Sequence, residues 1–444
     1  MESIFSPFMK EGLTTLRIRH NFKTGAFTFF AARDFEKELD FSKYNKDFAL
    51  TSILTDKNVY FGTSQVLEMY KQAGLSDYLE RVMGLMRDGK HMGIDFMYNE
   101  HLNIRFICGI HSDVRGRNNK SHATFSGATR WHGLNEPEID VILDALNLSR
   151  AMSFKNTAVN LPYGGCKSCL HMEPVDINNM QVMGFLAYAC DSTRCITGPD
   201  MSMPKEMVKV MNENFTGQYC GGPGSSMGDT GIPTALGVYL ALKQAVKFVT
   251  GSESLDGMSV AVQGLGAVGY ALAHHLTTEK TRLVITNRSQ GKIDRFLQEH
   301  PGHDITVVST DEMLYTDVDI LCPCAMGGIF GEEEIAKLKA KYIFGGANNT
   351  LRAKSQQEEI RLAKILAHRG ILYQTEWWHN GAGVLGAAFE YINGRDTTVT
   401  KEDLDKRVRE VIPANTWDNL NKANELGITP TECAYARCQD IIYK

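Results

Sequence analysis

Two lysines, Lys155 and Lys167, are the residues of this sequence best suited to chemistry. They lie twelve positions apart in MSFKN and LPYGGCK, and Gly164 and Gly165, between them, are interpreted as a turn. A lysine is normally solvated, but desolvation and a nearby like charge lower its pKa towards neutrality in an apolar, glycine-lined segment. Such a pair suits proton transfer by one lysine and carboxylate binding by the other. The alternative is a structural lysine near a turn.

A second candidate site is the loop GLGAVG. Gly264, Gly266 and Gly269 follow the apolar run 259–262 and open the helix-like stretch AVGYALAHHL. Glycines at this spacing allow a tight turn, close approach of the backbone to a pyrophosphate, and close packing of helix and strand. The helix N-terminus adds N–H donors and partial positive charge for the phosphates. The pattern predicts a dinucleotide site, and an ordinary glycine-rich turn is the alternative.

The end of the next strand candidate, 283–285, indicates which nicotinamide cofactor binds. A carboxylate there would accept hydrogen bonds from the ribose 2′-OH and repel a 2′-phosphate. This sequence instead has Asn287, Arg288 and Ser289, which favour a 2′-phosphate and therefore NADP over NAD. The alternative is that Arg288 points to solvent or stacks on adenine while NAD binds.

The elements that must position the dinucleotide loop are short apolar strands alternating with helices. Strand candidates are 259–262, 283–285, 305–308, 318–321, 342–344 and 371–373. Helical stretches include 332–341 and 351–368, and Gly370 ends the second. This alternation predicts a parallel sheet covered on both faces, in a Rossmann-type domain.

The upstream half is less regular and predicts a mixed α/β domain. Strand candidates are 26–30 and 104–107, and a helix begins near Asn135 with Pro137 in its first turn. Its apolar face comprises Ile139, Ile142, Leu143 and Leu146. The glycine-rich stretch 221–231 is interpreted as a hinge. The predicted divisions are 1–232 for substrate binding and oligomerisation, 233–390 for NAD(P), and a helical segment 391–444 packing back on the first domain.

Composition restricts the class of protein. The chain has 444 residues, 43% hydrophobic and 22% charged, with a net charge of −5, as expected for a globular protein of two domains. Interspersed charges favour neither a nucleic acid nor a membrane surface as partner. The first residues make a poor signal peptide, so a cytoplasmic location is expected.

Ten cysteines raise the question of a metal. Cys166 and Cys169 form a CxxC, and Cys322 and Cys324 form a CxC, but no further Cys or His completes a zinc-finger spacing. Reduced, mostly buried thiols are favoured, and no metal site is expected.

The sequence resembles the Glu/Leu/Phe/Val dehydrogenase family, closest to its leucine and phenylalanine dehydrogenase branch. The motifs that carry this resemblance occur in family order over residues 90–395: RAMSFKNTAVNLPYGGCK from Arg150, TGPD from Thr197, TALGV from Thr234, VAVQGLGAVGYAL from Val260, GGANN from Gly345, and NGAGV from Asn380. The segment GATR from Gly127 departs from the Gly-Gly-Thr-Arg of the family. Several ordered motifs spread over two domains are specific for the family, although not for the amino acid.

The resemblance implies a role for each matching residue. Lys155 would bind the substrate carboxylate with help from Asn349, and Lys167 would be the lysine of low pKa that activates water. Asp200 would carry the proton to and from the substrate nitrogen; without the resemblance, a helix N-cap before residue 201 is its alternative. Further substrate contacts are expected from Gly127, Met152 and Asn380, and further cofactor contacts from Thr234, Ala267, Val268, Asn348 and Asn380.

The family implies a two-domain α/β enzyme with its active site in the interdomain cleft. It would deaminate an L-amino acid oxidatively to its 2-oxo acid and ammonia, and run the reverse reductive amination, by hydride transfer with NADP or NAD. The alternatives are an NADP-dependent reductase of another carbonyl or imine, and a catalytically silent nucleotide-sensing relative. N-terminal segments of this family support subunit assembly, so residues 1–65 are expected to serve a homo-oligomer, with a surface extension as the alternative.

Overall fold

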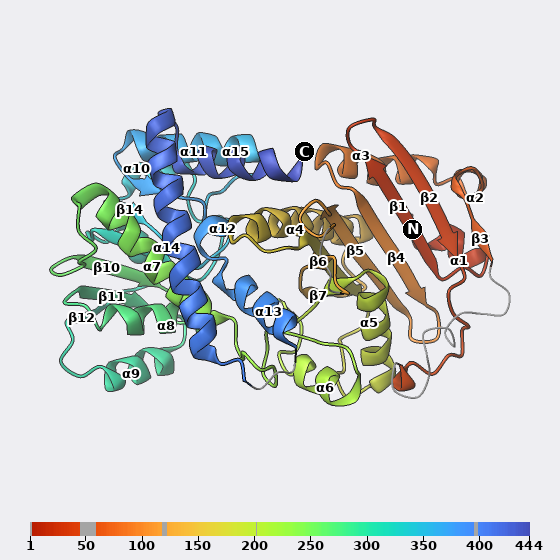
Figure 1. Cartoon of the computed structure of the whole chain (residues 1–444), viewed down its shortest axis with the longest axis horizontal. Helices are drawn as coiled ribbons and strands as arrows, with labels where there is room; N and C mark the ends of the chain where they lie inside the picture. Colours follow the sequence, from red (N-terminus) through yellow and green to blue (C-terminus); the bar gives the residue numbers. More distant parts are fainter. Residues whose placement is uncertain (1, 45–58, 118–121, 201, 395–397) are drawn as a thin grey trace. The chain divides into compact units, whose positions relative to one another are not determined.

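The computed structural model consists of two compact units (Figure 1). It describes residues 2–44, 59–117, 122–200, 202–394 and 398–444. Unit 1 comprises residues 1–157, 161–228 and 387–397, and unit 2 comprises residues 158–160, 229–386 and 398–444. Each unit is built on its own β-sheet. The predicted division near residue 232 therefore falls close to the observed change of unit at residue 228.

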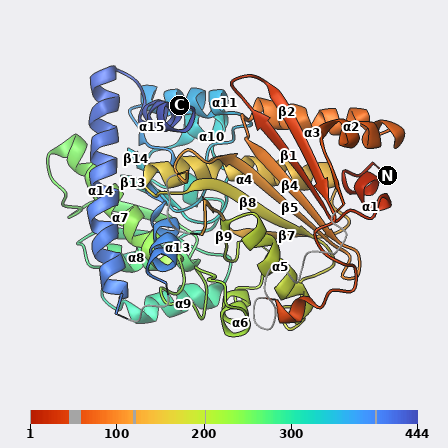
Figure 2. The ribbon, with the colours of Figure 1, turned by 45° about the vertical axis from the view of Figure 1, so that its right-hand side comes forward.

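Unit 1 contains a mixed sheet that has nine strands within the described residues. The strands are β1 (Thr15–Asn21), β2 (Ala26–Ala32), β3 (Tyr60–Phe61), β4 (Gly93–Asn99), β5 (Ile104–Ser112), β6 (Phe125–Ser126), β7 (Thr129–His132), β8 (Gly164–His171) and β9 (Cys195–Ile196). Their order is β3-β2-β1-β4-β5-β8-β6-β9, and β7 pairs with β8. Figure 2 shows β2, β1, β4, β5 and β8 side by side. Strands β1 to β5 and β8 pair antiparallel, whereas β6 and β7 run parallel to β8.

Both faces of this sheet are apolar, and each buries a separate cluster of side chains. Side chains alternate along a strand, so Ile107 of β5 enters one cluster and Cys108 the other. The first cluster includes side chains from α1 (Phe5–Lys10), α2 (Thr63–Gln72), α3 (Ser76–Asp88) and α4 (Glu138–Ala158). The second includes side chains from η1 (Phe41–Lys43), α5 (Met180–Ser192) and α6 (Met207–Asn214).

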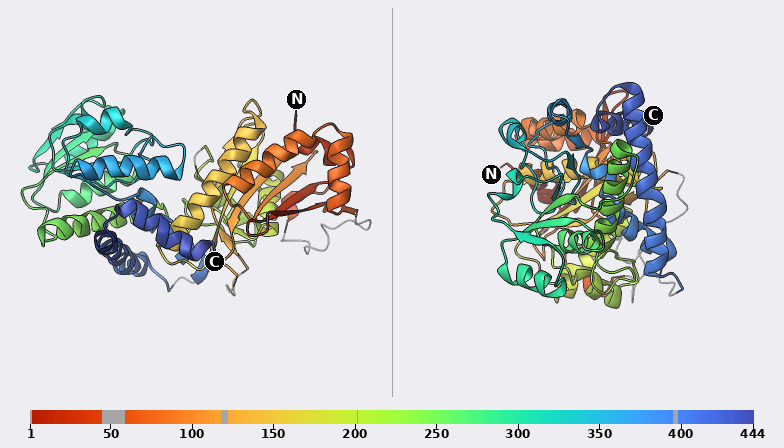
Figure 3. Two further views of the ribbon diagram at one scale, coloured as in Figure 1. Left: turned by 90° about the horizontal axis from the view of Figure 1, so that it is seen from above. Right: turned by 90° about the vertical axis from the view of Figure 1, so that its left-hand side faces the viewer.

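Helix α4 confirms the helix predicted from near Asn135, with one difference on its apolar face. Ile142 and Leu146 are buried, whereas Leu143 is 38% exposed. Each residue turns the helix by about 100°, so consecutive positions cannot all face the sheet. Figure 3 (left) shows α2, α3 and α4 on one side of the strands of unit 1.

Unit 2 contains six parallel strands in the order β12-β11-β10-β13-β14-β15. They are β10 (Ser259–Gln263), β11 (Arg282–Thr286), β12 (Ile305–Val307), β13 (Ile320–Pro323), β14 (Tyr342–Ile343) and β15 (Leu372–Tyr373). Numbered within the unit, this is the 3-2-1-4-5-6 order of the dinucleotide-binding fold. The predicted parallel sheet is confirmed.

The helices of unit 2 are α7 (Gly231–Thr250), α8 (Ala267–Leu276), α9 (Gln290–Glu299), η3 (Met313–Tyr315), α10 (Glu332–Lys337), α11 (Gln356–His368), α12 (Glu376–His379), α14 (Lys401–Leu426) and α15 (Pro430–Ile442). Helix α13 (Ala382–Asn393) begins in unit 2, and its residues from 387 onward belong to unit 1. Helix α11 begins later than predicted because Ser355 caps it by accepting from Glu358 N. The prediction that Gly370 ends this helix agrees with its left-handed φ of 74°.

The C-terminal segment differs from its prediction, because α14 and α15 belong to unit 2. Helix α14 lies along α7, as the right-hand view of Figure 3 shows. Its buried side chains include Leu404, Val408 and Ile412, and a Cβ at Gly237 of α7 would lie 3.5 Å from Ile412 Cγ1. The apolar stripes of the two helices therefore bury each other. Of the helices in the described ranges, none is both long and apolar enough to cross a bilayer.

Candidate active site

Gly164 and Gly165 open strand β8 and do not form the predicted turn. A Cβ at Gly165 would lie 2.2 Å from Ser153 N of α4, and a Cβ at Gly164 would lie 2.0 Å from Ser112 O of β5. Both distances are far below van der Waals contact. The two glycines are therefore required for close packing of α4 and β5 against β8, which then carries Lys167.

Helix α4 lies directly over the part of the sheet that contains Lys167. In the register of β5 and β8, Lys167 is opposite Gly109, where a Cβ would lie 2.6 Å from Ala145 O of α4. Paired residues on adjacent strands point to the same face, so the side chain of Lys167 is on the α4 side. Lys155 and Met152 are half-buried on α4, three positions apart and on one helix face.

Lys167 and Asp200 form an ion pair, with the ammonium donating to Asp200 Oδ2. The side chain of Lys167 is 4% exposed and that of Asp200 is 26% exposed. The main chain fixes the aspartate, since Asp200 N donates to Thr129 O at 3.0 Å. The N-cap alternative for Asp200 does not fit, because the next described helix, α6, begins at Met207. The structure thus brings together two of the residues that the resemblance selected.

Gly127 lies between β6 and β7, beside the strand that carries Lys167. Its N–H donates to Ile196 O at 3.2 Å, and a Cβ at this position would lie 2.0 Å from Cys166 O. No larger residue fits between these backbones. Gly127 therefore packs against Cys166, the residue that precedes Lys167 in β8.

Arg130, for which the sequence predicts no role, also binds Asp200. Its Nε donates to Asp200 Oδ2 at 3.2 Å, while its Nη1 donates to both oxygens of Asp144 at 3.1 Å. Asp144 in turn lies 3.2 Å from His132 Nε2, and His132 Nδ1 lies 2.8 Å from Glu136 Oε2. A chain of alternating charge thus runs from the Lys167–Asp200 ion pair to the surface.

The pKa values follow from these contacts. Burial disfavours the charged form of Arg130, but the charges of Asp200 and Asp144 outweigh it and raise the pKa of this guanidinium. Burial also acts to raise the pKa of Asp144, but the hydrogen bond with His132 and the charge of Arg130 lower it below its usual value. The hydrogen bond to Asp144 raises the pKa of His132.

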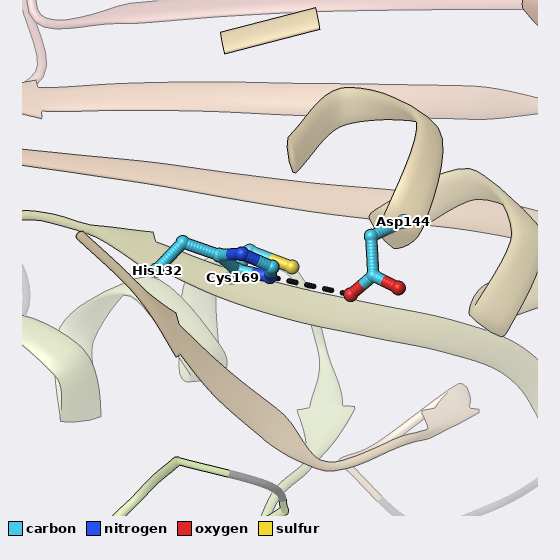
Figure 4. A group of neighbouring side chains, drawn as sticks. All are labelled: His132, Asp144 and Cys169. Atoms are coloured by element: carbon cyan, nitrogen blue, oxygen red, sulfur yellow. Dashed lines mark hydrogen bonds and ion pairs between the residues drawn. The ribbon is translucent and has the colours of Figure 1, made fainter. Parts of the chain in front are cut away.

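His132, Asp144 and Cys169 are spaced closely enough to hold a metal ion, with ligand atoms within 4.8 Å of one another (Figure 4). Their hydrogen bonds already account for the arrangement, because His132 Nε2 lies 3.2 Å from Asp144 Oδ2. Arg130 already pairs with both carboxylate oxygens of Asp144. A hydrogen-bonded network accounts for this group of side chains.

The CxxC of the sequence is divided between the two faces of the sheet. Cys166 is in the apolar cluster with α5, and Cys169 is in the cluster with α4, because positions three apart on a strand point to opposite sides. All ten cysteines are free, and burial raises the pKa of Cys324 in the CxC to about 12.

The dinucleotide loop of unit 2 has the geometry expected from its glycines. Gly264 has a left-handed φ of 92°, and a Cβ at Gly269 would lie 1.8 Å from Gly264 O. By contrast, a Cβ at Gly266 would meet no atom within 4 Å, so this position is open to an approaching phosphate. Gly266 is the N-cap of α8, whose first residues are Ala267 and Val268. The loop therefore fits a nicotinamide dinucleotide.

Asn287 and Arg288 follow β11 and differ in their surroundings. Asn287 Oδ1 accepts from Leu265 N at 3.1 Å, and its Nδ2 donates to Ser289 O at 3.2 Å, so this side chain supports the glycine loop. Arg288 is exposed, and its Nη2 lies 3.4 Å from Met326 Sδ. The guanidinium is thus the more accessible of the two groups.

The asparagines of unit 2 lie beside the start of α8. Asn380 Nδ2 donates to Asn348 Oδ1 at 2.8 Å and to Gly346 O at 3.3 Å, and a Cβ at Gly346 would lie 2.4 Å from Val268 Cγ1. Asn349 has a left-handed φ of 52°, a conformation that asparagine tolerates better than most residues. Asn348 and Asn380 are therefore close to the dinucleotide loop.

Thr234, in the first turn of α7, is held in the same part of unit 2. Its Oγ1 donates to Thr230 O at 2.8 Å and would lie 2.5 Å from a Cβ at Gly383 of α13. A Cβ at Gly231, also on α7, would lie 2.7 Å from Ala267 Cβ. The start of α7 therefore packs tightly on α13 and on the start of α8.

Known proteins match both parts of the chain. The family model for Glutamate/Leucine/Phenylalanine/Valine dehydrogenase matches residues 224–438, and the model for the Glu/Leu/Phe/Val dehydrogenase dimerisation domain matches residues 108–216. Phenylalanine dehydrogenase from Lysinibacillus sphaericus is 30% identical over 382 residues, which are 85% of this chain and 93% of that protein. L-tryptophan dehydrogenase from Nostoc punctiforme is 31% identical over 363 residues, which are 80% and 95% of the two chains.

A solved structure agrees with these matches. The crystal structure of L-tryptophan dehydrogenase from Nostoc punctiforme superposes with a TM-score of 0.66 at 30% identity, covering 81% of this chain and 98% of that one. The resemblance found in the sequence is thereby confirmed. The chain belongs to the Glu/Leu/Phe/Val dehydrogenase family and is an amino-acid dehydrogenase, an oxidoreductase that uses a nicotinamide cofactor.

Proposed function

We propose that Lys167 and Asp200 are the acid–base pair with which this enzyme interconverts an L-amino acid with its 2-oxo acid and ammonia. The observation that carries this proposal is their ion pair, in which the lysine side chain is 4% exposed. A lysine and a carboxylate so placed exchange protons with a bound substrate rather than with bulk water. Lys155 on α4 binds the substrate carboxylate, aided by Asn349, and Gly127 and Met152 contact the substrate.

The reaction needs one hydride transfer and several proton transfers. In deamination, a nicotinamide held at the Gly264–Gly269 loop would supply the acceptor for the hydride on Cα, and loss of this hydride turns the substrate into an imine. Asp200 takes the proton from the substrate nitrogen before this step. Lys167, as the neutral amine, then removes a proton from the water that attacks the imine carbon, and Asp200 returns its proton to the nitrogen. As the C–N bond breaks, the hydroxyl proton leaves with the ammonia as ammonium. The sum consumes one water and one oxidised cofactor, and it releases ammonium, the 2-oxo acid, the reduced cofactor and one proton, which Lys167 holds until it is lost to solvent.

We infer that NADP is preferred over NAD. Arg288 follows the second strand of the sheet, where an acidic residue would select the ribose 2′-OH of NAD. Its exposed guanidinium suits a 2′-phosphate, and the described ion pairs do not include it. Gly264, Gly266 and Gly269 bind the pyrophosphate with Ala267 and Val268, and Thr234, Asn348 and Asn380 contact the rest of the cofactor.

A homo-oligomer in solution is part of the same proposal. It is supported by the description of the model matching residues 108–216 as a dimerisation domain. Sedimentation of the purified chain measures the subunit number directly, and a monomer at assay concentration would contradict this assignment.

A panel of 2-oxo acids tests the function directly. Each acid is mixed with NADPH or NADH, with and without ammonia, and cofactor oxidation is followed by absorbance. We expect oxidation only when ammonia is present, and formation of the corresponding L-amino acid. Oxidation without ammonia would identify a reductase of another carbonyl, and cofactor binding without any turnover would identify a silent nucleotide sensor.

A further inference from the structure

We infer that Arg130, held by Asp144, is the positioning residue that fixes Asp200 against Lys167. This inference rests on the proposed function, because it assigns a task to the surroundings of the same acid–base pair. The observation behind it is that one guanidinium bridges two carboxylates from different elements, Asp200 after β9 and Asp144 on α4.

The geometry of the bridge restrains the guanidinium in its plane. Arg130 uses Nε towards Asp200 and Nη1 towards Asp144, which are different edges of one planar group. A guanidinium bound at two edges cannot rotate without breaking one of the contacts. Its Cα is also fixed, because Arg130 is in β7, opposite Cys169 of β8 in the parallel register. The pairing of β7 with β8 therefore determines the direction from which Arg130 Nε donates to Asp200.

An arginine suits this task better than another lysine. Asp200 must exchange a proton with the substrate nitrogen, so a neighbour that can itself give up or take a proton would compete for it. A guanidinium keeps its proton in proteins, and the two carboxylates raise the pKa of Arg130 further. Arg130 can thus orient Asp200 and stabilise its charge without taking part in the proton transfer.

Asp144 balances the charge that this arrangement introduces. With Lys167 and Arg130 both on Asp200, two cations face one carboxylate; Asp144 supplies the second anion, 3.1 Å from Arg130 Nη1. Its side chain is anchored on the other side by His132 Nε2 at 3.2 Å. Removing the charge of Asp144 would weaken the contact that holds this edge of the guanidinium.

The test uses Arg130→Ala, Arg130→Lys and Asp144→Asn in the full chain. Displacement of a reacting group by about 1 Å costs on the order of 100-fold in rate, so we expect Arg130→Ala to lower kcat by about this factor. The KM for the 2-oxo acid should change by less than about 3-fold, because Arg130 is not assigned to substrate binding. The matched control is Arg87→Ala, which removes an arginine that is 48% exposed on α3.

Two readouts separate positioning from mere structural support. Millimolar guanidinium chloride should restore part of the kcat of Arg130→Ala by occupying the vacated site, and should leave Arg130→Lys and Asp144→Asn unchanged. Removal of the guanidinium charge also disfavours ionised Asp200, so the acidic limb of the kcat/KM profile should move to higher pH. Among the described ion pairs, Lys167 and Arg130 contact Asp200 directly, and Asp144 and His132 are linked to it through Arg130.

The outcomes distinguish this inference from the function on which it rests. If Lys167→Ala and Asp200→Asn are inactive while Arg130→Ala and Arg130→Lys keep the parental kcat and pH profile, the positioning role is overturned and the function stands. If Lys167→Ala and Asp200→Asn remain active, the proposed function itself fails. A third outcome is that Arg130→Ala loses activity, guanidinium does not restore it, and Arg130→Lys keeps the parental kinetics. This result would show that Arg130 only supports the structure and does not position Asp200.

Discussion

Lys167 on β8 and Asp200 after β9 are 33 positions apart in the sequence and form an ion pair beneath helix α4. Neither residue belongs to a local motif that would place it next to the other. Strand β7, between them in space, carries Thr129, whose carbonyl holds Asp200 N at 3.0 Å. The acid–base site is therefore produced by the register of the sheet in unit 1.

Replacement of Lys167 tests the assigned base. We expect Lys167→Ala to lose about 10²- to 10⁴-fold in kcat, the usual effect of removing an acid–base or electrostatic group. Cofactor affinity should be unchanged, because the dinucleotide loop is in unit 2. Stopped assays and a cofactor titration measure the two effects, with Lys71→Ala, at a lysine that is 75% exposed on α2, as the control. Near-parental turnover would exclude the mechanism.

Replacement of Lys155 should act mainly on substrate binding. A hydrogen bond to a charged group contributes about 1.5–3 kcal/mol, so the KM of Lys155→Ala for the 2-oxo acid should rise by at least about 10-fold. A smaller fall in kcat is expected from misplacement of the substrate. Initial rates over a range of 2-oxo acid concentrations give both constants. Unchanged KM and kcat would remove Lys155 from the site.

Cofactor preference depends on the residues after β11. A guanidinium paired with a 2′-phosphate near solvent contributes on the order of 1–3 kcal/mol, so Arg288→Ala should weaken NADP binding about 5- to 150-fold and spare NAD. The double change Asn287→Asp with Arg288→Ile should reverse the preference, since an aspartate can still accept from Leu265 N. Fluorescence titration with both cofactors decides this, and a parent chain that binds NAD at least as tightly as NADP contradicts it.

Glu376 makes a specific contribution to the pH dependence of stability. Burial, with the charge of Glu359, raises its pKa to about 7, against about 4.3 in an unfolded chain, despite donors from Thr350 and Tyr373. The folded state therefore binds the proton more tightly. The contribution of this group to the free energy of unfolding is fully present below about pH 4. It is lost as the pH rises through 7, and the loss is on the order of 3 kcal/mol.

The substitution Glu376→Gln removes this titration. We expect the free energy of unfolding of the variant, relative to the parent, to be higher at pH 8 than at pH 5. Urea unfolding at both values measures the difference, with Glu333→Gln, at an exposed carboxylate of α10, as the control. An equal effect of Glu376→Gln at the two pH values would show that Glu376 does not titrate in this range.

The sequence by itself determined the features that depend on neighbouring residues. The spacing of Gly264, Gly266 and Gly269 fixes the backbone of a single strand–turn–helix unit, and the structure has that geometry. The alternation of apolar strands with helices likewise predicted the parallel sheet of unit 2. Both are short-range properties, because the residues involved are within one element or two consecutive ones.

Tertiary structure decided the rest. Gly164 and Gly165 resembled a turn, but they open β8 because α4 and β5 approach them closely. Helix α14 joined unit 2 because its apolar stripe meets α7, which its own periodicity could not specify. The contacts of Arg130 with Asp144 and Asp200 join β7, α4 and the segment after β9, elements whose proximity depends on the pairing of strands far apart in the sequence. A residue's type and spacing can suggest its chemistry, but its partners across a sheet are set by the long-range register of the fold.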